Sequence, residues 1–199
     1  MRKEKLEELH SYIEELKVKK FELLDANGRF LKSERYSVEL NNGHTMVREK
    51  LIKNGKDGSA AIVLPITSEG NTLLIVQPRV FSKTKVAVEI PAGYVDDGED
   101  YETAARRELF EETGFVPEKM TLLGSFYQDQ GCSGAYNKAF LAEGCKKVSE
   151  QHLDGDEFIR YFECSYDEAL ELIDMGMIND AQSQLVFERS KQYLKNRLR

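Results

Sequence analysis

Residues 93–115 read GYVDDGEDYETAARRELFEETGF, and this stretch decides the fold. Three of its acids, Glu108, Glu111 and Glu112, are spaced i, i+3 and i+4, so on a helix they share one face. Like charges this close repel one another and weaken a helix that has no ligand. Clusters of oxygen ligands suit hard cations such as Mg²⁺ or Mn²⁺, so the three acids are candidate metal ligands. The alternative is an acidic helix face that is simply solvated.

The residues on either side of these acids predict where the helix begins and ends. Asp100 is a good N-cap, and Gly114 is a typical residue at the C-terminal end. Residues 86–90 read as a short strand, and residues 91–99 form a loop that contains Gly93. A strand, a glycine loop and an acidic helix together predict a site for metal and phosphate.

This stretch resembles the signature of the Nudix hydrolases, G-x5-E-x7-R-E-U-x-E-E-x-G-U, in which U is a bulky apolar residue. Every defined position is filled, by Gly93, Glu99, Arg107, Glu108, Leu109, Glu111, Glu112, Gly114 and Phe115. The resemblance implies Mg²⁺-dependent cleavage of a diphosphate, with Mn²⁺ as an alternative ion. It also implies an α+β fold in which helices sandwich a mixed sheet, over about residues 58–199.

The resemblance assigns roles within the site. It implies metal binding by the Ala92 carbonyl, Glu108, Glu111 and Glu112, with Glu111 also counted as catalytic. It implies that Arg107 pairs with Glu99 and, with Gly93, supports the loop. Because Arg107 is offset by roughly 100° from its neighbour on a helix, we expect its side chain to point to this loop and away from the metal.

Several flanking segments resemble the ADP-ribose pyrophosphatase branch of the family. They are the E-x-P-A-G lead-in at 89–93, Gln77-Pro78-Arg79, Arg48-Glu49 and G-x-I-x-D-A at 176–181. On this basis Arg48, Arg79 and Glu89 are candidate substrate-binding residues, although the arginines are equally consistent with surface ion pairs. ADP-ribose is therefore the expected substrate.

Two departures from the branch keep other substrates open. Val88 stands where a tryptophan is common, and Gln130 stands where a proline is usual. GDP-mannose is therefore an alternative substrate, and a nucleotide-sugar sensor without turnover is a further reading.

An acidic loop at 153–158 is the expected source of the general base. The resemblance favours Glu157, with Asp156 and Asp154 as alternatives. The other interpretation is that these acids are only solvated charges on a loop. Phe30 or Tyr36 is a candidate for stacking on a base, although exposed strand aromatics more often pack within sheets.

Composition limits the class of protein. The chain has 199 residues and a net charge of −7, which argues against a nucleic-acid-coating protein. Its three cysteines match no zinc spacing, so we expect reduced thiols in a cytoplasmic protein, with a catalytic cysteine as the alternative. No apolar leader and no run of 18 apolar residues occurs, so neither secretion nor membrane insertion is expected.

The region before the signature domain reads as a separate unit. Residues 1–18 have the spacing of an amphipathic helix that docks on its own domain or on a partner. Strands are expected at 21–24, 30–40 and 45–52, with turns at Asn27-Gly28 and Asn42-Gly43. We therefore expect two domains, 1–57 and 58–199. The resemblance implies that the first is exchanged between the subunits of a homodimer.

The remaining strands and helices are predicted from the spacing of apolar residues and from capping residues. Strands are expected at 60–66, 72–77, 120–127, 137–142 and 158–164, and residues 143–157 are expected to be irregular. Ser165 and Glu168 form a capping box that begins a helix ending near residue 175. A last helix is expected at 180–195, with Leu185, Val186, Tyr193 and Leu194 as its buried positions.

Overall fold

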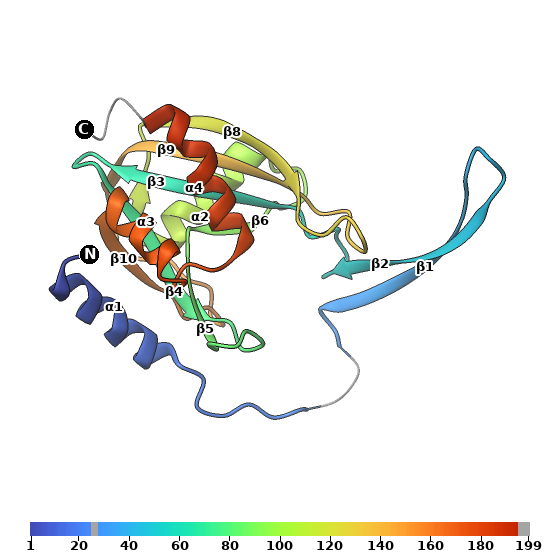
Figure 1. The fold of residues 1–199 in the computed structure, drawn as a ribbon, viewed down its shortest axis with the longest axis horizontal. Helices are drawn as coiled ribbons and strands as arrows, with labels where there is room; N and C mark the ends of the chain where they lie inside the picture. Colours follow the sequence, from blue (N-terminus) through green and yellow to red (C-terminus); the bar gives the residue numbers. More distant parts are fainter. Residues whose placement is uncertain (25–27, 195–199) are drawn as a thin grey trace.

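The computed structural model describes residues 1–24 and 28–194 (Figure 1). The helices of this part are α1 (Lys3–Leu16), α2 (Tyr101–Thr113), α3 (Tyr166–Asp174) and α4 (Ala181–Leu194). The strands are β1 (Leu31–Glu39), β2 (Thr45–Lys53), β3 (Ala60–Thr67), β4 (Asn71–Pro78), β5 (Val86–Glu89), β6 (Ala92–Tyr94), β7 (Phe115–Val116), β8 (Lys119–Tyr127), β9 (Tyr136–Lys147) and β10 (Arg160–Ser165).

The main sheet is mixed and has the strand order β10-β4-β3-β9-β7. Strands β3 and β9 run parallel, and the other pairings are antiparallel. Strand β5 adds to β4, β6 adds to β3, and β8 adds to β9. Among the described residues, none of the helices combines the length and apolar character needed to span a membrane.

Strand β3 shows how the sheet is covered on both faces. Ala61 and Val63 point to one face, where Ala104, Ala105 and Leu109 of α2 pack on them. Ile62 and Leu64 point to the other face, where α1, α3 and α4 pack. Successive residues of a strand point to opposite faces, so a strand covered on both sides is a continuous apolar run. The predicted sandwich of helices around a mixed sheet is confirmed (Figure 1).

Helix α2 begins and ends where its sequence predicts. The Asp100 side chain accepts hydrogen bonds from the backbone N–H groups of Glu102 and Thr103, each at 3.0 Å. Gly114 is left-handed, with φ of 77°, and its N–H donates to the carbonyl of Phe110. Caps of this kind satisfy backbone groups that a helix end leaves free. The Ser165–Glu168 capping box at α3 is also present.

Helix α1 packs on the same core as α3 and α4. Leu9 is fully buried, and Ile13 and Leu16 pack against the core cluster beside it. Of the two readings of this helix, docking on its own chain is therefore the one the structure shows. The division of the chain into residues 1–57 and 58–199 stays a prediction.

The hairpin of β1 and β2 projects from the body of the molecule (Figure 1). Nearly all of β1 is exposed, and the Leu51 N–H on β2 donates to the carbonyl of Cys132 at 2.6 Å.

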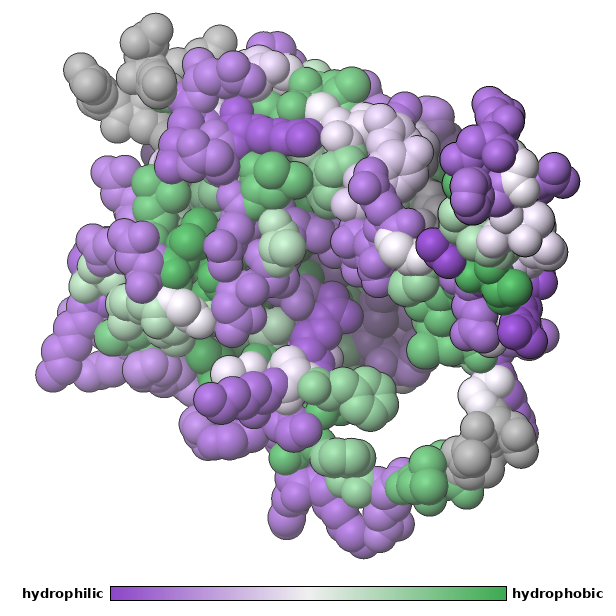
Figure 2. Space-filling model, turned by 45° about the vertical axis from the view of Figure 1, so that its right-hand side comes forward, coloured by the Kyte–Doolittle hydropathy of each residue, from purple (hydrophilic) through white to green (hydrophobic). Residues whose placement is uncertain are grey.

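The strand expected at 21–24 is wrong, because these residues form no ladder and Leu24 is 93% exposed. In Figure 2 hydrophobic side chains are visible along this segment, which arches away from the body. Of the expected turn at Asn27-Gly28, the asparagine lies outside the described residues.

Other differences from the expected elements have long-range causes. The short strand β6 forms because Ala60, Ala61 and Ile62 supply an edge for residues 92–94. Strand β9 continues to Lys147 because β3 and β7 pair with its far end, so the first part of 143–157 is not irregular. On α4, Val186 and Leu194 are buried and Leu185 is half-buried. The predicted burial of Tyr193 is wrong, because this residue is 39% exposed. Phe187, which was not predicted to be buried, is buried.

Candidate active site

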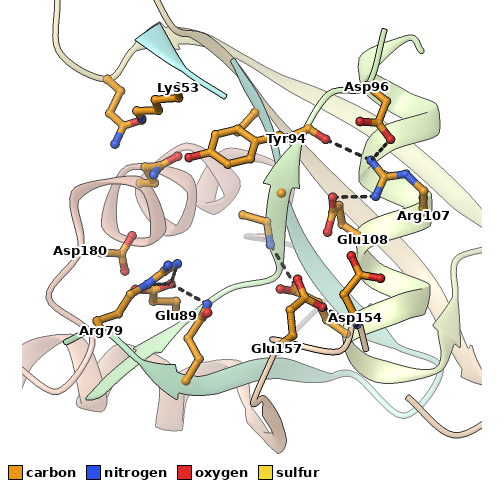
Figure 3. Close-up of a pocket in the computed structure, with 17 residues that line it drawn as sticks. Lys53, Arg79, Glu89, Tyr94, Asp96, Arg107, Glu108, Asp154, Glu157 and Asp180 are labelled. Atoms are coloured by element: carbon orange, nitrogen blue, oxygen red, sulfur yellow. Dashed lines mark hydrogen bonds and ion pairs between the residues drawn. The ribbon is translucent and has the colours of Figure 1, made fainter. Parts of the chain in front are cut away.

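Two of the three helix acids face a shared cavity. Glu108 and Glu112 lie one turn apart on α2, both are buried, and both line a cavity of about 590 Å³ (Figure 3). Glu111 is half-exposed and lies outside the lining set. The cavity is lined by Lys53, Ala60, Gln77, Arg79, Glu89, Ala92, Gly93, Tyr94, Asp96, Arg107, Glu108, Glu112, Gln128, Asp154, Glu157, Asp180 and Gln182.

Gly93 lets the loop backbone approach the acids. A Cβ at this position would lie 2.0 Å from Glu108 Cδ and Oε1, which is far inside van der Waals contact. The neighbouring Ala92 N–H donates to Glu112 Oε2 at 3.1 Å. Only glycine therefore fits at this position of β6, against the Glu108 carboxyl group, without a rearrangement.

Arg107 joins the loop to the helix acids. Its guanidinium donates to Glu99 Oε1 at 3.0 Å and Oε2 at 2.9 Å, and to the Tyr94 carbonyl at 3.0 Å. The pairing with Glu99 is thus present. However, Arg107 Nη1 also lies 2.7 Å from Glu108 Oε1 and 3.1 Å from Glu111 Oε2. The expectation that Arg107 points to the loop is met, but the expectation that it points away from the metal acids is wrong, because its long forked side chain reaches both.

The buried acids are held close together, which changes their proton affinity. Burial raises the pKa of Glu108 to about 7, against the charge of Arg107 and with the help of the charges on Glu111 and Glu157. Burial also raises the pKa of Glu112 well above its ordinary value, and the charges of Glu108 and Glu157 add to the effect. Desolvation and like charges both disfavour ionised carboxylates, so this wall favours the binding of a cation.

The opposite wall of the cavity carries an ion pair. Arg79 Nε and Nη2 donate to the Glu89 carboxylate, with the shortest contact 2.7 Å from Nη2 to Oε2. Gln77 Nε2 donates to the same oxygen at 3.1 Å. The Glu89 hydrogen bond and charge raise the pKa of Arg79. Both of these predicted substrate-binding residues therefore line the cavity, and they lie across it from the helix acids (Figure 3).

Asp180 lies near this ion pair, at the start of α4. Its Oδ2 accepts a hydrogen bond from the Ser183 N–H at 2.7 Å, while its buried Oδ1 has no hydrogen-bond partner among the described residues. Burial raises the pKa of Asp180, and the charge of Glu89 adds to the effect. Asp180 therefore presents a second acidic group to the Arg79 end of the cavity.

The acidic loop contributes Asp154 and Glu157 to the cavity. The Asp154 N–H donates to Glu157 Oε2 at 3.1 Å, and the Glu157 N–H donates to the Asp154 carbonyl at 3.0 Å. This reciprocal turn places Glu157 beside the helix acids (Figure 3). Asp156, the other candidate base, is not in the lining set.

Some predicted residues lie elsewhere. Arg48 is exposed on β2, outside the lining set, and donates to the Val47 carbonyl. Phe30 packs on Tyr94 with ring centroids 6.2 Å apart, and Tyr36 hydrogen-bonds to Glu34. Neither Phe30 nor Tyr36 lines the cavity of this chain.

Several residues that line the cavity were not predicted from the sequence. Asp180 belongs to the G-x-I-x-D-A motif at 176–181, but only the packing of α4 against the sheet places it near Arg79. Tyr94 directly follows the signature glycine, while Lys53 and Gln182 carry no local signal. These four come from three segments far apart in the chain, because Asp180 and Gln182 are neighbours.

The NUDIX domain family matches residues 56–184, well over half of the chain. The chain belongs to the Nudix family. The class expected from the signature, a Nudix pyrophosphohydrolase, is thereby confirmed.

Relatives of this Nudix chain include two proteins of similar likeness. The ADP-ribose pyrophosphatase of Bacillus subtilis is 37% identical over 73% of this chain and 77% of that protein. The methanol dehydrogenase activator of Bacillus methanolicus is 37% identical over 81% of this chain and 85% of that protein. A solved structure described as an ADP compounds hydrolase has a TM-score of 0.73 at 22% identity, covering 86% of this chain and 90% of that one. That last likeness supports the fold.

Nudix hydrolases use divalent metals such as Mg²⁺, and the acids of this chain suit such an ion. Among the described residues no three His, Cys, Asp or Glu side chains already converge on one point, since Arg107 engages two of the glutamates and the third turns to Ala92. The donor set is nevertheless entirely oxygen, and it accumulates like charge in a buried place. A hard divalent cation would relieve that charge, so the residues fit Mg²⁺.

Proposed function

We propose that this Nudix chain hydrolyses the diphosphate bond of a nucleoside diphosphate sugar with Mg²⁺, and that ADP-ribose is its main substrate. The products would be AMP and ribose 5-phosphate. The observation that carries the proposal is the two-walled cavity, with Glu108, Glu112 and Glu157 on one side and Arg79 with Glu89 on the other. Similarity to the ADP-ribose pyrophosphatase of Bacillus subtilis supports the choice of substrate.

The two walls suit the two parts of such a substrate. Glu108, Glu111, Glu112 and the Ala92 carbonyl would hold Mg²⁺, which supplies charge neutralisation for the diphosphate and a more acidic bound water. Arg79, held in a fixed orientation by Glu89, would donate to phosphate or sugar oxygens at the opposite wall.

Glu157 would act as the general base. It accepts a proton from the attacking water while a new O–P bond forms and the bridging P–O bond breaks. Its place in the cavity beside Glu108 and Glu112 supports this role, and Asp154 on the same loop is the alternative base.

A substrate panel tests the proposal. The protein is incubated with Mg²⁺ and ADP-ribose, GDP-mannose, UDP-glucose, diadenosine polyphosphates or oxidised dNTPs, and released phosphomonoesters are measured. We expect ADP-ribose to be cleaved with the highest kcat/KM, and Glu112→Gln to lower kcat about 10²- to 10³-fold. A preference for GDP-mannose would mean that ADP-ribose is the wrong substrate but that a nucleoside diphosphate sugar is still cleaved. Binding without turnover would mean that the chain is a sensor and not an enzyme.

A second candidate function comes from the other relative. Because the chain is as similar to the methanol dehydrogenase activator of Bacillus methanolicus, it is a candidate for stimulating a dehydrogenase. The rate of a methanol dehydrogenase is measured with the wild-type chain and with Glu112→Gln. Stimulation by the wild type alone would tie this effect to hydrolysis, and equal stimulation by both would indicate binding.

We also propose that the chain forms a homodimer through its N-terminal segment. An isolated two-stranded hairpin is marginally stable in water, and the β1–β2 hairpin exposes Leu31, Tyr36 and Val47. A partner subunit would cover these side chains, and it would give Arg48 a route to a cavity other than its own. Light scattering with gel filtration should give twice the mass of one chain, and Leu31→Glu with Val47→Glu should shift it to a monomer.

A cytoplasmic location is proposed as well. Support comes from the cysteines, since Cys145 and Cys164 are buried as free thiols and Cys132 is exposed as one. Fractionation of cells followed by detection of the chain in each fraction tests this proposal.

A further inference from the structure

Gln151 joins both ends of the acidic loop to the end of helix α2. Its Nε2 donates to the carbonyl of Glu112 at 2.6 Å and to the carbonyl of Ile159 at 3.2 Å. Glu112 belongs to the last turn of α2, where helical carbonyls have no partner within the helix. Ile159 is buried and directly precedes β10. One amide group thus uses both of its donors to close the loop at its base.

Neighbouring contacts fix the same end of the loop. The His152 N–H donates to the carbonyl of Glu111 at 2.8 Å, and its ring stacks on Phe110 at 4.9 Å between centroids. The Val148 N–H donates to the carbonyl of Gly114 at 2.9 Å. The chain before the loop therefore follows the last turn of α2.

The loop beyond these anchors is exposed. Residues 154–158 are all exposed, and Asp154 and Glu157 form the reciprocal turn described above. Because this turn is internal to the loop, it shapes the loop but does not tie it to the domain. The direction in which Glu157 points then depends on the anchors at residues 151, 152 and 159.

We propose that Gln151 is a positioning residue for hydrolysis, which acts by holding Glu157 over the cavity. The Gln151 side chain that donates to the Glu112 carbonyl also fixes the base of the loop. It therefore fixes the position of Glu157 relative to helix α2. This inference rests on the role of Glu157 in the proposed function. It adds a residue that is not among those lining the cavity.

Gln151→Glu and Gln151→Ala test the two donated hydrogen bonds. Glutamate has nearly the same size but brings a carboxylate against two carbonyl oxygens, so it separates hydrogen bonding from packing. Gln192→Glu, the same change at an exposed position of α4, is the matched control. For both Gln151 variants we expect kcat for ADP-ribose to fall on the order of 10- to 100-fold, with KM changed less than twofold, because the base is misplaced while the binding wall is intact.

A double-variant cycle asks whether Gln151 acts through Glu157. In a Glu157→Gln background, adding Gln151→Glu should lower kcat by less than twofold, since the group that it positions is already gone. A full additional loss in that background would overturn the proposal, as would a kcat for the single variants equal to that of Gln192→Glu.

Amide hydrogen exchange supplies a readout that does not depend on turnover. Peptides covering 153–158 should exchange at least several-fold faster in Gln151→Glu than in wild type, while peptides from β3 and α4 stay unchanged. Unchanged exchange at 153–158 would overturn the positioning role. If wild type cleaves none of the substrates but exchange still rises as expected, the proposed function fails and the anchoring of the loop by Gln151 stands.

Discussion

Arg79 and Glu89 form a two-pronged ion pair at the wall of the cavity opposite the helix acids, with Nη2 2.7 Å from Oε2. Arg79 directly follows β4 and Glu89 ends β5, and the antiparallel ladder of these strands brings residues 75–78 opposite residues 86–89. Glu89 therefore fixes the plane of the guanidinium group, and it leaves other donors of Arg79 available to a ligand.

Arg79→Lys should weaken substrate binding more than catalysis. A lysine keeps the positive charge but cannot make the forked contact with Glu89 and a ligand oxygen together. We expect KM to rise about tenfold, equal to about 1.4 kcal/mol, with kcat changed much less. Steady-state kinetics with ADP-ribose measure this, and Arg106→Lys is the control because Arg106 pairs with Glu102 on an exposed part of α2. Equal kinetics in the two variants would remove Arg79 from the binding site.

Gly93→Ala should reduce activity more than stability. The added Cβ would lie 2.0 Å from Glu108 Cδ, so the carboxyl group must move. Overpacking costs about 1–3 kcal/mol, whereas a displaced metal ligand would stop turnover. Urea unfolding and an ADP-ribose assay measure the two effects. Gly134→Ala is the matched control, because the nearest atom to a Cβ there is 3.6 Å away, an ordinary contact.

The difference between α2 and the cavity shows what local sequence can predict. The start and the end of α2 were predicted correctly because Asp100 and Gly114 act on neighbouring backbone groups. Strand β6 was missed because residues 92–94 become a strand only when β3 offers its edge. The signal that defines it lies about 30 positions away in the chain.

The same distinction holds within the site. Glu108 and Glu112 were predicted from helical spacing, and both line the cavity. Lys53 and Asp180 were missed because they reach the cavity only after β2 and α4 have packed. Arg48 was predicted from a short resemblance, and it lies on the projecting hairpin, outside the described residues that line the cavity.

Glu168 should make the stability of the protein depend on pH in the acid range. Burial alone would raise its pKa, but hydrogen bonds from the Arg2 and Ser165 N–H groups and the charge of Arg2 lower the pKa to about 2. An acid whose folded pKa lies below its ordinary value of 4.5 stabilises the fold above that value. This contribution should be lost as the pH falls from about 4.5 toward 2.

Urea unfolding from pH 6 to pH 3 checks this expectation. Wild type should lose free energy of unfolding over the range, and Glu168→Gln should be less stable at pH 6 and show a flatter dependence. Glu7→Gln is the control, since Glu7 is an exposed residue of α1. Parallel curves for wild type and Glu168→Gln would show that Glu168 is not the source of the slope.

Leu9→Ala should show that α1 belongs to the core of the folded chain. Leu9 is fully buried with residues of the sheet and of α3 and α4, so truncation leaves a cavity. We expect a loss of about 2–5 kcal/mol in the free energy of unfolding. Leu6 is half-buried on the same helix, and Leu6→Ala should cost less. Equal and small losses in both variants would mean that α1 contributes little to the core.

Glu112→Gln should separate metal binding from folding. Glu112 is buried in the cavity wall, and its ionised form is disfavoured there. Glutamine removes that buried charge and can still accept the hydrogen bond from the Ala92 N–H. Without Mg²⁺ we therefore expect the variant to unfold at a temperature at least equal to that of wild type.

With Mg²⁺, wild type should become more stable than Glu112→Gln. An ion that binds only the folded wild type stabilises it by about 2.7 kcal/mol at a concentration 100 times its Kd, and EDTA should reverse the gain. The variant should show a much smaller shift, and its kcat should fall about 10²- to 10³-fold, because charge stabilisation by a metal is worth several kcal/mol. Glu111→Gln should lose less, because Glu111 is half-exposed and outside the cavity lining. A variant at position 112 that keeps both its Mg²⁺ shift and its activity would remove Glu112 from the metal site.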